Sequence, residues 1–112
     1  MTNGEIGAAS QGAPVALQID GEMTIYRAAE LKDVLYGALR EAAAEARGLA
    51  LDLSQVTEFD SAGIQLLLVA RREAQRQGQT LHLVAPSGAV REVFALTVLA
   101  ARFDGEQRGE QP

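Results

Sequence analysis

The stretch VTEFDSAGIQLLLVARREA, residues 56–74, carries the clearest pattern in this chain. Asp60 and Ser61 stand directly before an almost uninterrupted apolar run. The helical spacing of that run predicts a helix from Ala62 to about Gln77, ended by Gly78. Its first two turns are apolar nearly all round, so we expect them to be well buried. The following RREAQRQ is expected to face solvent.

Strand and helix patterns alternate on both sides of this helix. Period-two apolar residues predict strands, and apolar residues at helical spacing between capping residues and glycines predict helices. The predicted elements are a strand over 14–19, the start of a short strand at 21–23, a helix over 25–46 with Thr24 as N-cap and Gly48 at its end, a strand over 49–53, a strand over 80–85, and a helix capped by Ser87 with Val90, Val93 and Phe94 facing inward. This alternation through short connections predicts an α/β domain with parallel neighbouring strands.

Composition limits the partners that the chain can have. Its 112 residues, 47% of them hydrophobic, fit one globular domain. A formal net charge of −5 argues against nucleic acid or anionic membrane as a partner. No secretory signal and no apolar run long enough for a membrane span are found, so the sequence predicts a cytoplasmic domain.

Nothing in the sequence forms a catalytic constellation. The chain has no cysteine, and its one histidine, His82, lies in a predicted strand opposite the apolar face. A surface imidazole is therefore the favoured interpretation of His82. No glycine-rich nucleotide-binding motif surrounds Gly63. The sequence predicts that the protein is no enzyme and holds neither a metal ion nor a cofactor.

Ser61 has two interpretations on physical grounds alone. Either Asp60 or Ser61 can cap the free N–H groups of the helix that follows, and we expect Ser61 to cap it whether or not it is modified. Alternatively, a phosphate on Ser61 would add about −1.5 to −2 charges at the positive end of the helix, which tolerates an anion while a docked partner does not. We interpret Gly63 as a position that leaves the backbone open to such a partner, because bulk there is expected to cost the fold little.

The segment LDLSQVTEFDSAGIQLLLVARREAQRQGQTLHLVAPSGAVREVFALTVLAARF, residues 51–103, resembles the STAS family, which includes sulphate transporter tails and bacterial anti-sigma factor antagonists. The residues that carry the resemblance are Gly21-Glu22-Met23, Asp52-Leu53, Asp60-Ser61-Ala62-Gly63-Ile64, Gly78, Ser87, Val90 and Leu96. The resemblance covers about residues 13–104, which we expect to be the domain, with disordered tails at 1–12 and 105–112. It implies a mixed four- or five-stranded sheet with helices packed on one side.

The resemblance also implies a function. In such antagonists a serine at the position of Ser61 is phosphorylated by an anti-sigma factor with a histidine-kinase-like ATPase fold, and the unphosphorylated form binds that factor. The partner-binding residues implied here are Thr24, Asp60, Ser61, Ala62, Gly63 and Ile64. Many phosphorylated members carry Asp where this chain has Thr24. The alternative is a non-phosphorylated STAS accessory subunit, bound to the ATPase of an ABC lipid transporter or acting in a chemotaxis-type signalling complex.

Overall fold

The computed structural model describes residues 12–96. Its elements in chain order are β1 (Val15–Gln18), β2 (Gly21–Met23), α2 (Ala28–Ala44), β3 (Leu49–Asp52), β4 (Val56–Phe59), α3 (Ser61–Arg76) and β5 (Leu81–Val84). Residues 88–96 are also helical. The predicted tails, apart from Gly12, and the end of the predicted domain after Leu96 lie outside the described residues.

The strands form two short parallel ladders that follow one another. β3 lies between β1 and β5, and β2 pairs with β4. Hydrogen bonds bridge the gap between the ladders, because the Ile19 N–H donates to the Asp52 carbonyl (3.1 Å) and the Gly21 N–H to the Gln55 carbonyl (3.0 Å). The β1–β2 segment therefore runs alongside the β3–β4 segment over its whole length.

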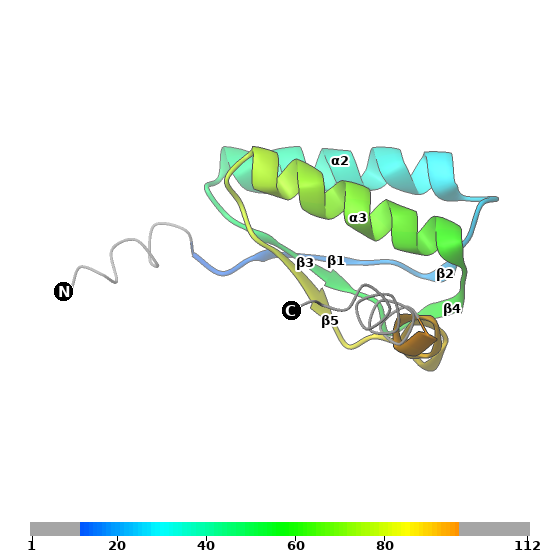
Figure 1. Ribbon diagram of the computed structural model, residues 1–112. Helices are drawn as coiled ribbons and strands as arrows, with labels where there is room; N and C mark the ends of the chain where they lie inside the picture. The colour runs from blue at the N-terminus through cyan, green and yellow to red at the C-terminus, as the bar shows by residue number, and fades with distance from the viewer. Residues whose placement is uncertain (1–11, 97–112) are drawn as a thin grey trace, which may run out of the picture.

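The predicted α/β class is confirmed, and α2 and α3 lie side by side over one side of the strands (Figure 1). The expected mixed sheet differs from the structure, since every strand pairing within residues 12–96 is parallel. The reason is that α2 and α3 each return the chain to the same end of the sheet before the next strand begins.

The sequence did not predict β4. Val56 and Phe59 are buried, but the two residues between them are both exposed. This pattern departs from period two because the partner strand shifts register between Gly21 and Glu22.

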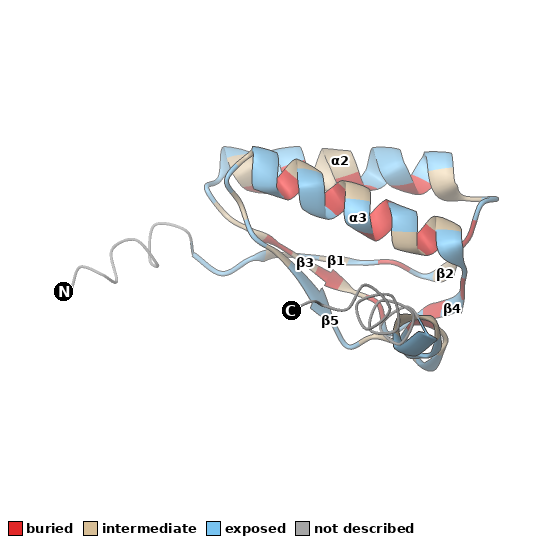
Figure 2. Ribbon diagram, in the orientation of Figure 1, coloured by how far each residue is buried: buried red, intermediate tan, exposed pale blue. Residues whose placement is uncertain are grey.

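The core lies between the strands and the two helices (Figure 2). Its centre is a row of fully buried leucines in β3 and directly after it, Leu49, Leu51 and Leu53. Leucines of α2 and α3 cover this row, namely Leu31, Leu35, Leu39, Leu66 and Leu67. On the opposite face of the sheet His82 is exposed, as predicted.

Helix α2 begins at Ala28, three residues later than predicted, and Thr24 is not its N-cap. The Arg27 N–H donates to the Thr24 carbonyl (3.0 Å) and the Tyr26 N–H to Thr24 Oγ1 (3.4 Å), so residues 24–27 form a turn that precedes the helix. At the other end Ala46 takes the left-handed conformation (φ 56°), so the helix ends before Gly48, where the sequence predicted its end. Gly78 (φ 70°) ends α3 as predicted.

Gly63 is buried, and the prediction that bulk there would cost the fold little is wrong. A Cβ on Gly63 would lie 2.5 Å from Cε1 of Phe59 and 2.8 Å from the carbonyl oxygen of Met23. The first turn of α3 therefore rests directly on β4 and on the end of β2. The space that we assigned to a partner is filled by the protein itself.

Gly63→Ala is expected to destabilise the fold, because the added methyl forces Phe59 or the Met23 backbone to move, at a cost of about 1–3 kcal/mol. Gly37→Ala is the matched control, since Gly37 is also helical but a Cβ there meets nothing within 4 Å. It gains helix propensity alone and should stabilise by about 0.5–1 kcal/mol. Urea unfolding of both variants measures the difference, and equal free energies of unfolding would contradict the close contact at Gly63.

Candidate functional site

The candidate site lies where the connections β2–α2 and β4–α3 meet. Met23 pairs with Phe59 in parallel strands, so the segments that follow them, Thr24–Arg27 and Asp60–Ser61, leave the sheet as neighbours. The N-termini of α2 and α3 consequently lie at the same end of the molecule (Figure 1). This end collects the first N–H groups and the positive ends of two helix dipoles.

Asp60 is the N-cap of α3. Its backbone is extended (φ −133°, ψ −166°), and its Oδ1 accepts hydrogen bonds from the N–H groups of Ala62 (2.9 Å) and Gly63 (3.4 Å). The expectation that Ser61 caps the helix is wrong, because the Asp60 carboxylate takes these N–H groups. The structure assigns the cap to Asp60.

Ser61 is the first residue of α3 and is exposed. Its hydroxyl makes no hydrogen bond to any residue of the described range 12–96. The side chain therefore stands at the surface beside an occupied cap, and the fold makes no structural use of its oxygen.

The other predicted site residues differ in how far they reach the surface. Ala62 is half-buried and borders a hollow toward α2, whereas Ile64 is half-buried on the opposite flank of α3, near Phe94. Gly63 is buried against Phe59. Thr24 is only 6% exposed, and its hydroxyl is bonded to the carboxylate of Glu22. Thr24 and Gly63 thus shape the site from inside.

Sequence reasoning missed two exposed residues at this end, Ile25 and Tyr26. They are 70% and 88% exposed, in the turn that precedes α2. The predicted helix over 25–46 includes both residues. Both fall outside the apolar stripe that Leu31 and Leu35 define, and this was the signal that could have placed them at the surface.

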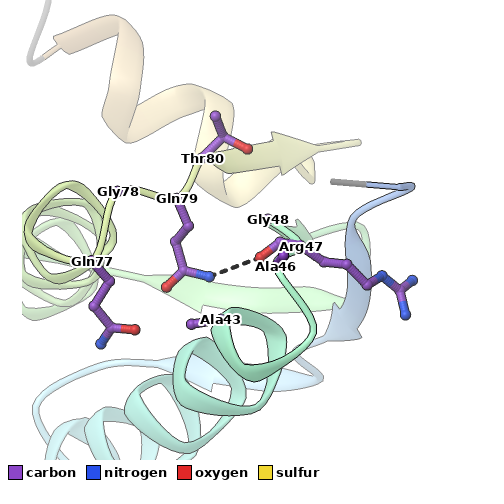
Figure 3. Close-up of a pocket in the computed structure, with 8 residues that line it drawn as sticks. All are labelled: Ala43, Ala46, Arg47, Gly48, Gln77, Gly78, Gln79 and Thr80. Carbon is purple, nitrogen blue, oxygen red and sulfur yellow. Dashed lines mark hydrogen bonds between the residues drawn. The ribbon is translucent and has the colours of Figure 1, made fainter. Parts of the chain in front are cut away.

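A second hollow lies at the opposite end, where the turns after α2 and α3 meet (Figure 3). Gln79 joins these turns, since its Nε2 donates to the Arg47 carbonyl (3.0 Å) and its N–H to the Ala74 carbonyl (2.9 Å). The Arg47 guanidinium points away and binds the Ala13 carbonyl and Glu45. We interpret this hollow as part of the turn structure, because its lining presents no ionisable group to a ligand.

Between residues 12 and 96, no helix has the length and apolar character needed to cross a membrane. In the same range, no three His, Asp or Glu side chains gather where they could hold a metal ion.

Parallel strands, two covering helices and an exposed serine beside a capped helix define a small α/β domain of the STAS type. A family model described as "Mlab, STAS domain" matches residues 6–101, and the chain belongs to this family. The resemblance in the sequence is thereby confirmed.

Two solved structures are similar to the chain. One is "Structure of the Anti-Sigma Factor Antagonist SpoIIAA in its Unphosphorylated Form", with 20% identity and a TM-score of 0.56 over 76% of this chain and 74% of that one. The other, "Crystal Structure Analysis of Mglu", has 25% identity and a TM-score of 0.54 over 65% of this chain. The chain spans 17% of the length of that protein. These likenesses support the STAS fold.

Asp60→Ala should lower the free energy of unfolding by about 1 kcal/mol, because the N–H groups of Ala62 and Gly63 lose their acceptor. Ser61→Ala is the control, and its effect should stay within about 0.5 kcal/mol because the hydroxyl supports nothing in the fold. Thermal and urea unfolding of both variants check the assignment. A larger loss of unfolding free energy in Ser61→Ala than in Asp60→Ala would show that Ser61, and not Asp60, caps the helix.

Proposed function

We propose that this chain is a cytoplasmic, non-catalytic partner-switching protein that binds a protein partner at the end where α2 and α3 begin. Phosphorylation of Ser61 controls the binding. One observation carries the proposal. Ser61 is exposed at the first position of α3, and its hydroxyl makes no hydrogen bond within residues 12–96 because Asp60 already caps the helix.

The position suits a phosphate that changes binding without unfolding the domain. The N-terminus of α3 favours negative charge, so a phosphate there leaves the helix intact. The same phosphate adds about −1.5 to −2 charges next to the Asp60 carboxylate. A partner seated on this end has to bury two neighbouring negative groups, which disfavours binding by several kcal/mol.

The exposed apolar residues at this end support a protein as the partner. Ile25 and Tyr26 lie in the turn beside the Asp60–Ser61 segment and are mostly open to solvent. Tyrosine and large aliphatic side chains are common anchors in the centres of protein interfaces. By the STAS resemblance, the partner is a serine-kinase anti-sigma factor with a histidine-kinase-like ATPase fold.

In a second candidate function, a protein partner binds at the same end of the molecule, but Ser61 is not phosphorylated. It is favoured by the description of the matching family model, "Mlab, STAS domain", which differs from that of an anti-sigma factor antagonist. In this alternative the chain is a permanent accessory subunit of an ABC lipid transporter, bound to its ATPase, or a part of a chemotaxis-type complex. Ser61 is then an exposed residue at the edge of a constant interface.

Binding of the native partner by Ser61 variants distinguishes the two candidates. The partner is first isolated with the full-length wild-type chain, and its affinity is then measured by calorimetry. We expect Ser61→Ala to bind within about twofold of wild type and Ser61→Asp to bind at least about tenfold more weakly, because the added carboxylate stands next to Asp60. Mass spectrometry of protein from its native host should find phosphate on Ser61.

Ser54→Asp is the matched control, because it adds the same charge at another exposed serine, in the turn between β3 and β4. Equal affinities of Ser61→Asp and Ser61→Ala, with no phosphate on Ser61, would favour the permanent subunit. Equal weakening by Ser54→Asp and Ser61→Asp would show a general charge effect and remove the switch.

A further inference from the structure

A groove runs between α2 and α3 on the side away from the strands. Its first half, a hollow of about 320 Å³, lies between Ala28 and Ala29 of α2 and Ala62, Leu66 and Val69 of α3. Alanine at three of these positions leaves the space between the helices open. This half is apolar, and it begins one residue after Ser61.

The second half of the groove is basic. It continues from the first half through Lys32 and Val69, which border both, into a hollow of about 620 Å³. Lys32 lies over the ring of Tyr36, with Nζ 5.7 Å from the ring centroid. Arg72 and Arg76 face them from α3. This half of the groove therefore carries a local excess of positive charge, although the chain as a whole has a net charge of −5.

The one acidic side chain that borders the basic half does not neutralise all of this charge. Glu73 accepts hydrogen bonds from Arg76 (2.6 and 3.0 Å) and from Gln77 (2.6 Å). These bonds lower the pKa of Glu73 to about 2, so its carboxylate stays committed to Arg76. Within residues 12–96, Arg72 forms no ion pair.

We infer that this groove binds an amphipathic, acidic segment of the protein partner. Apolar side chains of the segment enter the alanine-lined half, and its carboxylates meet Arg72, Lys32 and Arg76. The inference rests on the proposed function, because the groove would be a second contact for the partner that docks at the Ser61 end. It adds that the partner carries apolar and acidic side chains at this contact.

The shape of the groove favours a protein segment over a flat charged surface. From Ala62 to Arg76 the groove follows α3 for roughly 20 Å, the length of a helix of about four turns. An amphipathic helix fills such a groove with side chains at spacings of three and four residues. An anionic lipid surface is opposed by the net charge of the chain.

Photo-crosslinking in the native host tests the inference with the full-length chain. The photo-reactive residue p-benzoylphenylalanine replaces Gln65 in the apolar half, Gln75 in the basic half, Tyr26 at the docking end, or His82 on the exposed face of the sheet as a control. We expect positions 65 and 75 to capture one stretch of one partner. Apolar residues should be found at the adduct of position 65, and Asp or Glu within two turns of the adduct of position 75.

Each other outcome overturns the inference. A stretch without acidic residues, a second copy of this chain, its own residues 97–112, lipid, or equal capture at position 82 would each do so. Capture at position 26 with none at 65 and 75 would refute the groove and leave the proposed docking end standing. No capture at positions 26, 65 or 75 would refute both.

Charge reversal provides the quantitative test, with the captured stretch synthesised as a fluorescent peptide. Arg72→Glu should weaken binding by about tenfold or more and flatten its dependence on salt, because repulsion replaces attraction in the groove. Arg71→Glu is the matched control, since Arg71 lies on the opposite flank of α3, beside Leu68 and Leu83, and should change affinity by less than about twofold. Equal effects of the two reversals would refute the groove.

Discussion

The contact of Gly63 with the Phe59 ring and the Met23 carbonyl is the constraint on which the functional end of this molecule depends. With no side chain at this position, the first turn of α3 descends onto β4 and onto the last residue of β2. Residue 60 is thereby held where its carboxylate reaches the N–H groups of the turn. Ser61, next in the chain, is pushed outward to the surface. Close packing inside and exposure outside are two results of the same missing Cβ.

Much of the fold could be predicted from local patterns, because those patterns report burial directly. The alternation of Leu49, Leu51 and Leu53 predicted a strand with one buried face, and Gly78 marked the end of α3 through its left-handed backbone. β4 escaped prediction because its register against β2 breaks the period of two, and that register depends on a distant segment. The start of α2 escaped for a similar reason. The Thr24 hydroxyl and carbonyl accept hydrogen bonds from the N–H groups of Tyr26 and Arg27, which favours a turn over a helix at these residues. Helix propensities alone do not include such side-chain hydrogen bonds.

The sequence identified the position of the candidate site, but it did not give the correct role for each residue there. Asp60 and Ser61 were both found, but two adjacent capping residues compete for the same N–H groups, and only the extended backbone of Asp60 decides between them. Gly63 was interpreted as a position open to a partner. The sequence pattern does not show that the Phe59 ring and the Met23 carbonyl pack against it. Tyr26 was missed because it was assigned to a helix that starts after it.

The division of labour between Asp60 and Ser61 has a physical consequence for a phosphate at this end. If Ser61 were the cap, its phosphate oxygens would accept hydrogen bonds from the N–H groups of the first turn. These bonds and the helix dipole would then compensate much of the added charge. Here the Asp60 carboxylate already occupies the N–H groups of Ala62 and Gly63. A phosphate on Ser61 therefore finds those donors taken and projects its charge outward, beside the apolar half of the groove that begins at Ala62. A phosphate whose charge is not compensated by N–H groups of the first turn repels negative groups of a docked partner. A phosphate that capped the helix would have a weaker effect on binding.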